Sequence, residues 1–280
     1  MLEGKSATKL VISNLSFAYK HKKIFHDITL ECQAGEVCAI LAPNGAGKST
    51  LFRILLGIIG RDCMGITLQN YHPKAFSVQD KAQKTRPTST INSPKDTQDI
   101  CLGKLDAYKR ARYIGYMPQF VETPFDYLVL DMVLLGAKTH LFGLPDLAME
   151  RKAMGLLEEL GITHLALMPI THLSGGQRQL VLLAQSLMQE NPILLLDEPS
   201  AHLDIKNKVL LFESITEQTR KKGLITLVNL HDIGLILRYA NTVYLIDKGH
   251  VYAAGNPREI LTRENLQTFF GLPEVLEDLY

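Results

Sequence analysis

The sequence predicts an α/β protein built on a parallel β-sheet. Strand-like apolar segments alternate with amphipathic helical segments along most of the 280 residues, a pattern typical of parallel strands joined by crossover helices. A glycine-rich loop at 42–50 stands between an apolar strand segment and a helical segment. A second apolar segment, 192–200, carries two acids near its end, which would place carboxylates at the carboxyl edge of the same sheet.

The elements follow from the hydrophobic pattern. Strands are expected where residues alternate or where short runs are β-branched and apolar, at 9–19, 28–32, 36–41, 192–200, 224–232 and 241–249. Helices are expected where apolar residues recur every three to four positions, at 51–59, within 127–169 and 171–191, at 209–223 and in the tail 256–280.

Residues 71–99 interrupt this pattern. Seven of these 29 residues are Ser or Thr, three are Pro and eight are charged, so burial cannot offset the entropy lost when they are ordered. We expect a polar surface insertion, with a partner-binding loop as the alternative.

Composition narrows the function classes. Lys and Arg total 30 and Asp and Glu total 29, a net charge of +1, which argues against a dedicated nucleic-acid binder. No window reaches the roughly 18 apolar residues of a membrane span, and the first ten residues lack the apolar core of a signal peptide. The four cysteines form no CxxC pair, which disfavours a zinc or thioredoxin-type site. An intracellular protein is expected.

The loop APNGAGKST at 42–50 has the residue types of a phosphate cradle. Glycines let backbone N–H groups approach a phosphate at the N-terminus of the next helix. In the pattern G-x-x-x-x-G-K-[ST], Lys48 would reach the β- and γ-phosphates and Ser49 would hold Mg²⁺. The first glycine of that pattern is Ala42 here; alanine costs little there if its φ is negative and is strained if its φ is positive.

Two further motifs suit phosphate chemistry. In ILLLDEP (193–199), Asp197 would join the Mg²⁺ shell and Glu198 would polarise an attacking water; two solvated acids at a strand end are the alternative. In LSGGQ (173–177), Ser174 and two glycines form an anion-ready turn at a helix start, with a plain helix cap as the alternative. No second Lys-bearing loop lies near LSGGQ in the sequence, so this turn would bind a phosphate held elsewhere.

Together the three motifs resemble Walker A, the signature and Walker B of the ATP-binding cassette (ABC) ATPases, over about residues 9 to 271. The resemblance implies a P-loop NTPase core with a parallel sheet, an N-terminal antiparallel β subdomain and an inserted α-helical subdomain. It divides the single domain 1–280 into a core at 1–125 and 171–255, a helical subdomain at 126–170, the insertion at 71–99 and a helical tail at 256–280.

The resemblance also implies roles for single residues. Tyr19 would stack on adenine, although it could simply pack on a strand. His231 would lie near the γ-phosphate, although it could be a core histidine. Asp204 would be the D-loop acid, in AHLD rather than the usual SALD. The implied ATP-binding residues are Tyr19, Asn44, Gly45, Ala46, Gly47, Lys48, Ser49 and Thr50; the Mg²⁺ ligands are Ser49, Gln119 and Asp197; the catalytic residues are Glu198, His231 and Gln119; and the signature residues are Ser174, Gly175, Gly176 and Gln177.

The resemblance further implies a head-to-tail dimer, in which ATP at Lys48 of one copy is closed over by Ser174 and Gly176 of the other. The segment 126–140 is similar to a stretch of the metal-chelate importer ATPases, which serve siderophores, haem, cobalamin or molybdate. In those ATPases an Arg commonly follows the Gly of this stretch, whereas in this chain Ala137 follows it, and Lys138 comes next. We therefore expect a peripheral ATPase at the cytoplasmic face of the membrane, with ATP and Mg²⁺. Its partners would be a permease and, acting on the permease, a substrate-binding protein; no nucleic acid is expected.

Two alternatives remain at this point. One is a soluble ABC ATPase in assembly or nucleic-acid processes. The other is a degenerate cassette that binds nucleotide without turnover. The only features that favour it are the departures from the family motifs at Ala42, Ala201 and His202.

Overall fold

The computed structural model describes residues 7–60, 65–72, 97–119, 125–140 and 146–271. Its strands are β1 (Lys9–Tyr19), β2 (Lys22–Gln33), β3 (Val37–Leu41), β4 (Ile66–Tyr71), β5 (Gln98–Cys101), β6 (Ile114–Met117), β7 (Ile193–Asp197), β8 (Ile225–Asn229), β9 (Thr242–Asp247) and β10 (His250–Gly255). Its α-helices are α1 (Lys48–Leu55), α2 (Ala107–Arg110), α3 (Val129–Leu134), α4 (Leu147–Glu159), α5 (Gly175–Leu187), α6 (Ile205–Lys222), α7 (Ile233–Tyr239), α8 (Pro257–Ile260) and α9 (Arg263–Phe270). Short 3₁₀ helices are η1 (Leu102–Lys104), η2 (Leu135–His140), η3 (Thr163–Leu165) and η4 (Ile170–His172).

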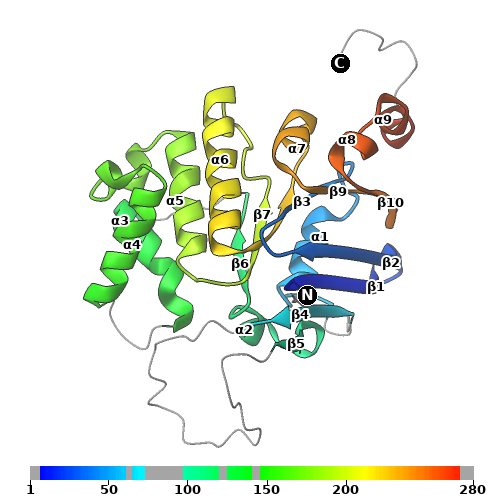
Figure 1. Cartoon of the computed structure of the whole chain (residues 1–280), viewed down its shortest axis with the longest axis horizontal. Helices are drawn as coiled ribbons and strands as arrows, with labels where there is room; N and C mark the ends of the chain where they lie inside the picture. Colours follow the sequence, from blue (N-terminus) through cyan, green and yellow to red (C-terminus); the bar gives the residue numbers. More distant parts are fainter. Residues whose placement is uncertain (1–6, 61–64, 73–96, 120–124, 141–145, 272–280) are drawn as a thin grey trace, which may run out of the picture.

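Two β-sheets form the centre of the molecule (Figure 1). The first is antiparallel, with the strand order β2-β1-β4-β5. The second has the order β10-β9-β3-β8-β7-β6, and its strands are parallel except for β10 at one edge. The predicted fold class, a parallel-sheet core with an antiparallel β subdomain and added helices, is confirmed.

Helix α1 is buried between the two sheets. Its residues Leu51, Phe52, Ile54 and Leu55 belong to one apolar cluster with side chains of β1, β2 and β4 on one side and of β3, β7 and β8 on the other. The opposite face of the parallel sheet packs on helices α3 to α7 in a second cluster. Strand β3 alternates between the clusters, as expected for side chains that point to opposite faces.

Helices α3 and α4 lie at the left of Figure 1, beside α5 and away from the antiparallel sheet. The helices expected within 127–169 are present there as α3, η2, α4 and η3. The tail contains α8 and α9, and residues 272–280 of the predicted tail lie outside the described residues.

Strand pairing reaches into the segment predicted as an insertion. Tyr71 ends β4, Gln98 begins β5, and these two residues are register partners. The backbone N–H of Asn70 donates to Asp99 Oδ1 at 2.9 Å. The polar segment therefore starts after β4 and ends before β5, inside the predicted bounds 71–99; residues 73–96 lie outside the described residues.

A buried arginine holds the far end of α1. Arg110 is 1% exposed and donates to the carbonyl oxygens of Ile54 at 2.6 Å, Leu55 at 3.1 Å, Gly103 at 3.2 Å and Leu105 at 2.9 Å. The last carbonyls of a helix lack partners within the helix and carry partial negative charge. Arg110 therefore joins the end of α1 to η1 and α2.

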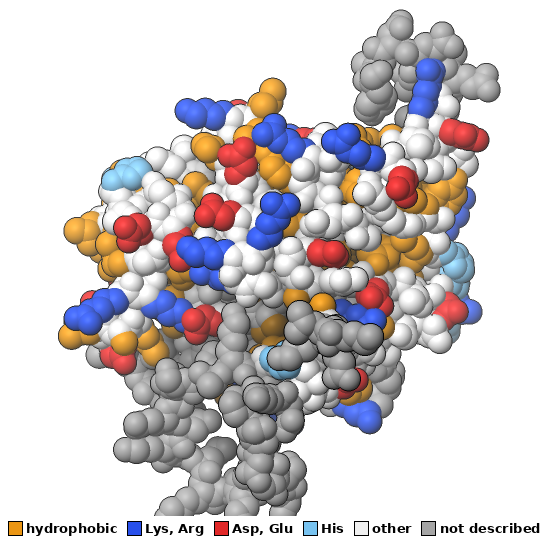
Figure 2. Space-filling model, in the orientation of Figure 1, with side chains coloured by type: hydrophobic (Ala, Val, Ile, Leu, Met, Phe, Trp, Pro, Cys, Tyr) orange, Lys and Arg blue, Asp and Glu red, His pale blue; other side chains and the backbone are white. Residues whose placement is uncertain are grey.

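The surface in Figure 2 mixes acidic and basic side chains over the visible face, in keeping with the net charge of +1. Within the described parts of the chain, we find no helix with the length and apolar character needed to span a membrane.

Candidate active site

The loop 42–50 joins β3 to α1 and is packed against the antiparallel sheet. Gly45 and Gly47 have φ values of 80° and 102°, which glycine adopts at low cost. A Cβ at Gly47 would lie 2.8 Å from Ile24 Cγ2 and 2.9 Å from Phe25 Cζ, both on β2. Only glycine fits there, because both the backbone conformation and the close approach of β2 exclude a side chain.

Ala42 lies outside the left-handed region, since it is not among the described residues with positive φ. It is 1% exposed, so its methyl group contributes to the core. The departure from the glycine of the pattern therefore causes no backbone strain. Its carbonyl oxygen accepts a hydrogen bond from Lys48 Nζ at 2.9 Å, which holds the lysine side chain back over the loop.

Three side chains from three elements converge at the carboxyl edge of the parallel sheet. His231 Nε2 lies 2.7 Å from Lys48 Nζ and 2.7 Å from Glu198 Oε1. The distance between Lys48 Nζ and Glu198 Oε1 is 4.0 Å. Lys48 begins α1, Glu198 follows β7 and His231 follows β8 by two residues. Because β7 and β8 are parallel neighbours, their carboxyl ends bring these residues together.

The electrostatics of this cluster suit a phosphate. The Lys48 side chain is 8% exposed, and burial lowers the pKa of its ammonium while the charges of Glu198 and Asp197 oppose that shift. His231 Nε2 can accept a hydrogen bond from Lys48 Nζ or, if it carries the ring hydrogen, donate one to Glu198 Oε1, but it cannot do both at once. The cluster thus combines a cation with a carboxylate–imidazole pair, which are the groups needed to neutralise phosphate charge and activate water.

Glu198 is held in an uncommon backbone conformation, with a φ of 48°. Such a conformation costs a non-glycine residue about 1–2 kcal/mol and is concentrated at functional sites. Gln119 Nε2 donates to Glu198 Oε2 at 3.1 Å, so both carboxylate oxygens have partners. The structure therefore brings Gln119, Glu198, His231 and Lys48 into one contact network.

Asp197 is 8% exposed and sits beside this network. Asn229 Nδ2 donates to its Oδ1 at 2.8 Å, and the Tyr116 hydroxyl donates to its Oδ2 at 3.4 Å. Burial, with the charge of Asp197 adding to it, raises the pKa of Tyr116 to about 12. Sequence reasoning missed Asn229 and Tyr116; the signal for Asn229 was a polar residue that ends the apolar strand ITLVN.

The residues present fit a magnesium nucleotide. Lys48 and the glycine loop provide donors for phosphate. The hydroxyl of Ser49, the carboxylate of Asp197 and the amide oxygen of Gln119 are the oxygen ligands that Mg²⁺ prefers. Next to Asp197, the buried Oδ1 of Asn229 has no hydrogen-bond partner among the described residues, which leaves an acceptor for a metal-bound water.

Tyr19 lies outside the Lys48 network. It ends β1 and is 41% exposed, and its ring meets that of Phe17 edge-on at 4.9 Å. Phe17 is the register partner of Phe25, whose ring packs on Gly47. Tyr19 is therefore connected to the loop through the strand pair and has an exposed face available for a base.

The signature and D-loop motifs pack on each other. Ser174 accepts from the Gln177 N–H at 3.3 Å, and Gln177 Oε1 accepts from the Ser174 N–H at 3.0 Å, which is a capping box of α5. Asp204 caps α6 by accepting from the Asn207 N–H at 2.8 Å. A Cβ at Gly176 would lie 2.5 Å from the Asn207 side chain. Within the described residues, the hydrogen bonds of these two caps stay inside their own helix starts and do not involve Lys48.

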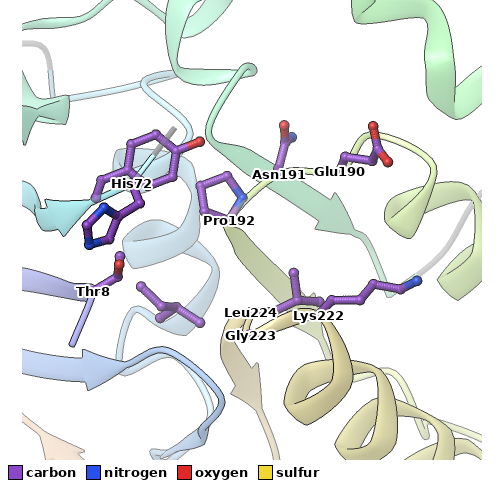
Figure 3. A pocket seen from close by; sticks show the side chains of 10 residues that line it. Thr8, His72, Glu190, Asn191, Pro192, Lys222, Gly223 and Leu224 are labelled. Carbon is purple, nitrogen blue, oxygen red and sulfur yellow. The ribbon is translucent and has the colours of Figure 1, made fainter. Parts of the chain in front are cut away.

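A separate pocket of about 210 Å³ opens at the amino end of the parallel strands (Figure 3). Its walls come from the chain before β1, the end of β4 and the turns that precede β7 and β8: Thr8, Tyr71, His72, Glu190, Asn191, Pro192, Lys222, Gly223, Leu224 and Ile225. None of the predicted site residues lines it, so the predicted chemistry belongs to the opposite edge of the sheet.

Comparison with known proteins shows the family to which this chain belongs. The family described as ABC transporter matches residues 25–201. The chain is 34% identical over 266 residues to the "Probable iron chelatin transport ATP-binding protein" of Helicobacter pylori, covering 94% of this chain and 93% of that protein. It is 33% identical over 267 residues to the molybdate import ATP-binding protein MolC of Haemophilus influenzae, covering 94% and 88%.

A solved structure agrees. In an inward-facing transporter described as of metal-chelate type, one chain is 31% identical, with a TM-score of 0.72 over 96% of this chain and 90% of that one. The family match covers more than half of the 280 residues, and both relatives match nearly from end to end. The chain belongs to the ABC transporter family, as an ATP-hydrolysing subunit of such a transporter.

Proposed function

We propose that this chain powers the import of a metal chelate, with an iron chelate as the first candidate. The observation that carries the proposal is the identity of 34% to a protein named for iron chelatin transport, over 94% of this chain. The metal-chelate type transporter structure supports the same class. Molybdate is the second candidate, because the MolC relative is 33% identical over a similar length.

In the proposed reaction, Lys48 and the N–H groups of the loop neutralise the β- and γ-phosphates of ATP. Glu198 takes a proton from the attacking water, and His231 orients Glu198 and the γ-phosphate. Bound Mg²⁺ would be held by Ser49, Gln119 and Asp197 and would add positive charge at the phosphates. The converging contacts of Lys48, Glu198 and His231 support this assignment and oppose a degenerate cassette.

The site is proposed to be completed by a second copy in a head-to-tail dimer. Ser174 and Gly176 of the second copy would close over ATP, with Tyr19 stacked on adenine and Asp204 at the interface. The support is that the helix N-terminus at Ser174 is exposed, suits an anion, and is not part of the Lys48 network of its own chain. Hydrolysis would then release the two copies.

A permease in the membrane is the proposed partner, with a substrate-binding protein acting on that permease. It would dock near Gln119 and the helical segment, where Phe125 and Leu167 are exposed apolar side chains of the kind found at protein interfaces. The ATPase would then sit at the cytoplasmic face of the membrane. The names of the relatives, as ATP-binding proteins of transport systems, support this placement.

The test combines hydrolysis and uptake. Glu198→Gln should retain ATP binding but hydrolyse ATP about 10²–10⁴-fold more slowly, since the general base is lost. Glu213→Gln is the matched control, because Glu213 is an exposed glutamate that pairs with Arg238 at 3.5 Å and lies outside the Lys48 network. Both variants are compared in cells lacking the native copy, with radiolabelled ferric chelate and radiolabelled molybdate as cargoes.

Uptake of the ferric chelate that needs Glu198 but tolerates Glu213→Gln supports the proposal. Glu198-dependent uptake of molybdate alone assigns the second cargo instead. Normal uptake of both cargoes without a functional chain would refute the importer role.

A further inference from the structure

A buried amide lies against the acid assigned to Mg²⁺. We propose that Asn229 is a positioning residue that fixes the Asp197 carboxylate and prepares it for the metal shell. The inference rests on the proposed Mg²⁺ role of Asp197, and it adds a residue that the motifs do not contain.

The geometry of the pair is specific. Asn229 is fully buried, is the register partner of Asp197 on the neighbouring strand, and donates from Nδ2 to Asp197 Oδ1 at 2.8 Å. An ionised carboxylate only accepts hydrogen bonds, so the amide nitrogen must face it and the amide orientation is fixed. The side-chain oxygen of Asn229 is then directed away from this carboxylate oxygen and has no hydrogen-bond partner among the described residues.

Packing alone does not explain an asparagine here. The preceding residues of β8 include Ile225, Leu227 and Val228, all buried, and an apolar residue would continue the strand without desolvating an amide. The amide also keeps its Oδ1 without a partner among the described residues. Both costs are understandable if one end of the amide holds Asp197 and the other accepts from a water of the Mg²⁺ shell.

Tyr116 provides a second, weaker restraint. Its hydroxyl donates to the other oxygen of Asp197 at 3.4 Å, and its ring packs edge-on against Phe52 of α1. The two donors come from β6 and β8, on either side of β7. A carboxylate held from both sides is ordered before the metal arrives, so less order has to be gained on binding.

The side chain can be tested apart from the backbone. The backbone oxygen of Asn229 accepts from the Glu198 N–H at 3.2 Å, and this contact persists in any Asn229 variant. Asn229→Leu therefore removes the amide next to Asp197 and keeps the strand contact to Glu198. Asn229→Val, a good strand former, serves as the second variant if the leucine is not accommodated.

The experiment measures nucleotide binding without turnover. In the Glu198→Gln protein, the affinity for a fluorescent ATP analogue is measured in EDTA and then across a Mg²⁺ titration. With Asn229→Leu added, the affinity in EDTA should stay within about 2-fold, while the Mg²⁺ concentration that half-maximally tightens binding should rise about 10–100-fold, as for other residues that support metal ligands. Tyr116→Phe should give a smaller rise.

Asn191→Leu is the matched control. Asn191 is also buried, donates from Nδ2 to a backbone oxygen, that of Ala111, at 3.0 Å, and has an Oδ1 without a partner among the described residues. It precedes β7 at the opposite edge, about 20 Å along the strand from Asp197. It should leave the Mg²⁺ midpoint unchanged.

Equal Mg²⁺ midpoints for the Asn229 and Asn191 variants would overturn the inference and leave the Mg²⁺ role of Asp197 in place. If the Glu198→Gln protein with Asn229 intact binds ATP without any effect of Mg²⁺, both the inference and the proposed Mg²⁺ site fall. A raised midpoint confined to the Asn229 variants supports it.

Discussion

The backbone conformation of Ala42 shows whether this departure from the glycine of the motif strains the loop. Its φ is not positive and its methyl group is buried, so alanine satisfies a position where the pattern has glycine. The pattern alone left open whether Ala42 would strain the loop. The described conformation answers that question.

Ala42→Gly should therefore weaken the fold without improving nucleotide binding. Glycine loses more backbone entropy on folding and removes a buried methyl, so we expect the free energy of unfolding to fall by about 1 kcal/mol. Denaturant unfolding measures the loss, and ATP titration should give an unchanged affinity. A clear gain in ATP affinity would mean that Ala42 distorts the loop.

Among residues outside the motifs, we expect substitution of Arg110 to cause the largest loss of stability. Arg110→Met would leave four carbonyl oxygens without their cationic donor. Since hydrogen bonds to charged groups contribute about 1.5–3 kcal/mol each and burial of the arginine is itself costly, a net loss of about 3 kcal/mol is expected. Thermal unfolding with and without ATP measures it; a variant as stable as the parent would show that α1 does not need this anchor.

At the scale of elements, ion pairs connect helices α4 and α6. Glu159, at the end of α4, accepts from Lys221 at 3.0 Å and Lys222 at 2.9 Å, at the end of α6. Burial raises the pKa of Glu159, but the hydrogen bonds and charges of Lys222 and Lys221 outweigh it, so the pKa lies below its ordinary value. The ion pairs link the helical segment to a helix of the core.

This link gives a pH dependence with a defined sign. The folded pKa of Glu159 is depressed, so its stabilisation is complete above the unfolded pKa of about 4.3 and is lost as the pH falls through the folded pKa. Glu159→Gln should lower the free energy of unfolding by about 0.5–1 kcal/mol at pH 7. The difference should shrink as the pH falls below about 4.3 and vanish only at a pH below the depressed folded pKa of Glu159. Denaturant titrations at both pH values test this; a difference independent of pH would point to packing instead.

The β4–β5 pair predicts which part of the polar segment can be removed. Tyr71 and Gln98 face each other in the ladder, so a turn of about four residues can join the adjoining residues His72 and Thr97. Replacing residues 73–96 by such a turn should retain ATPase activity and raise the free energy of unfolding by about 1–2 kcal/mol, from loop-closure entropy.

Deleting the whole of 71–99 instead removes Gln98 and Asp99 from β5, including the contact to Asn70, and should destabilise the protein. Equal stability of the two deletions would show that β5 contributes little. A shorter deletion that fails to fold would show that 73–96 is structural.

The same elements show what could be predicted from the sequence. The strands and helices that carry the three motifs were predicted because their apolar runs are continuous and their motifs lie at strand ends. Strand β6, which carries Tyr116, was not among the predicted strands. β4 and β5 were missed because the polar segment separates the two partners. The φ of Glu198 and the contacts of Gln119, Tyr116 and Asn229 depend on neighbouring strands that are far apart in sequence.

For the whole molecule, the central claim is that the Lys48 site is completed by the signature of a second copy. Within one copy, Lys48, Glu198 and His231 are assembled, while Ser174 is exposed and caps its own helix. We therefore propose that a complete phosphate site requires two copies arranged head to tail.

Sedimentation of the Glu198→Gln protein with and without Mg-ATP tests this claim most directly, with Lys48→Ala added as the control that removes phosphate binding. The account predicts an ATP-dependent shift from monomer to dimer, which is lost with Lys48→Ala and with Ser174→Arg. The account would be contradicted by a protein that binds Mg-ATP but whose two copies do not associate, either in isolation or in complex with the permease.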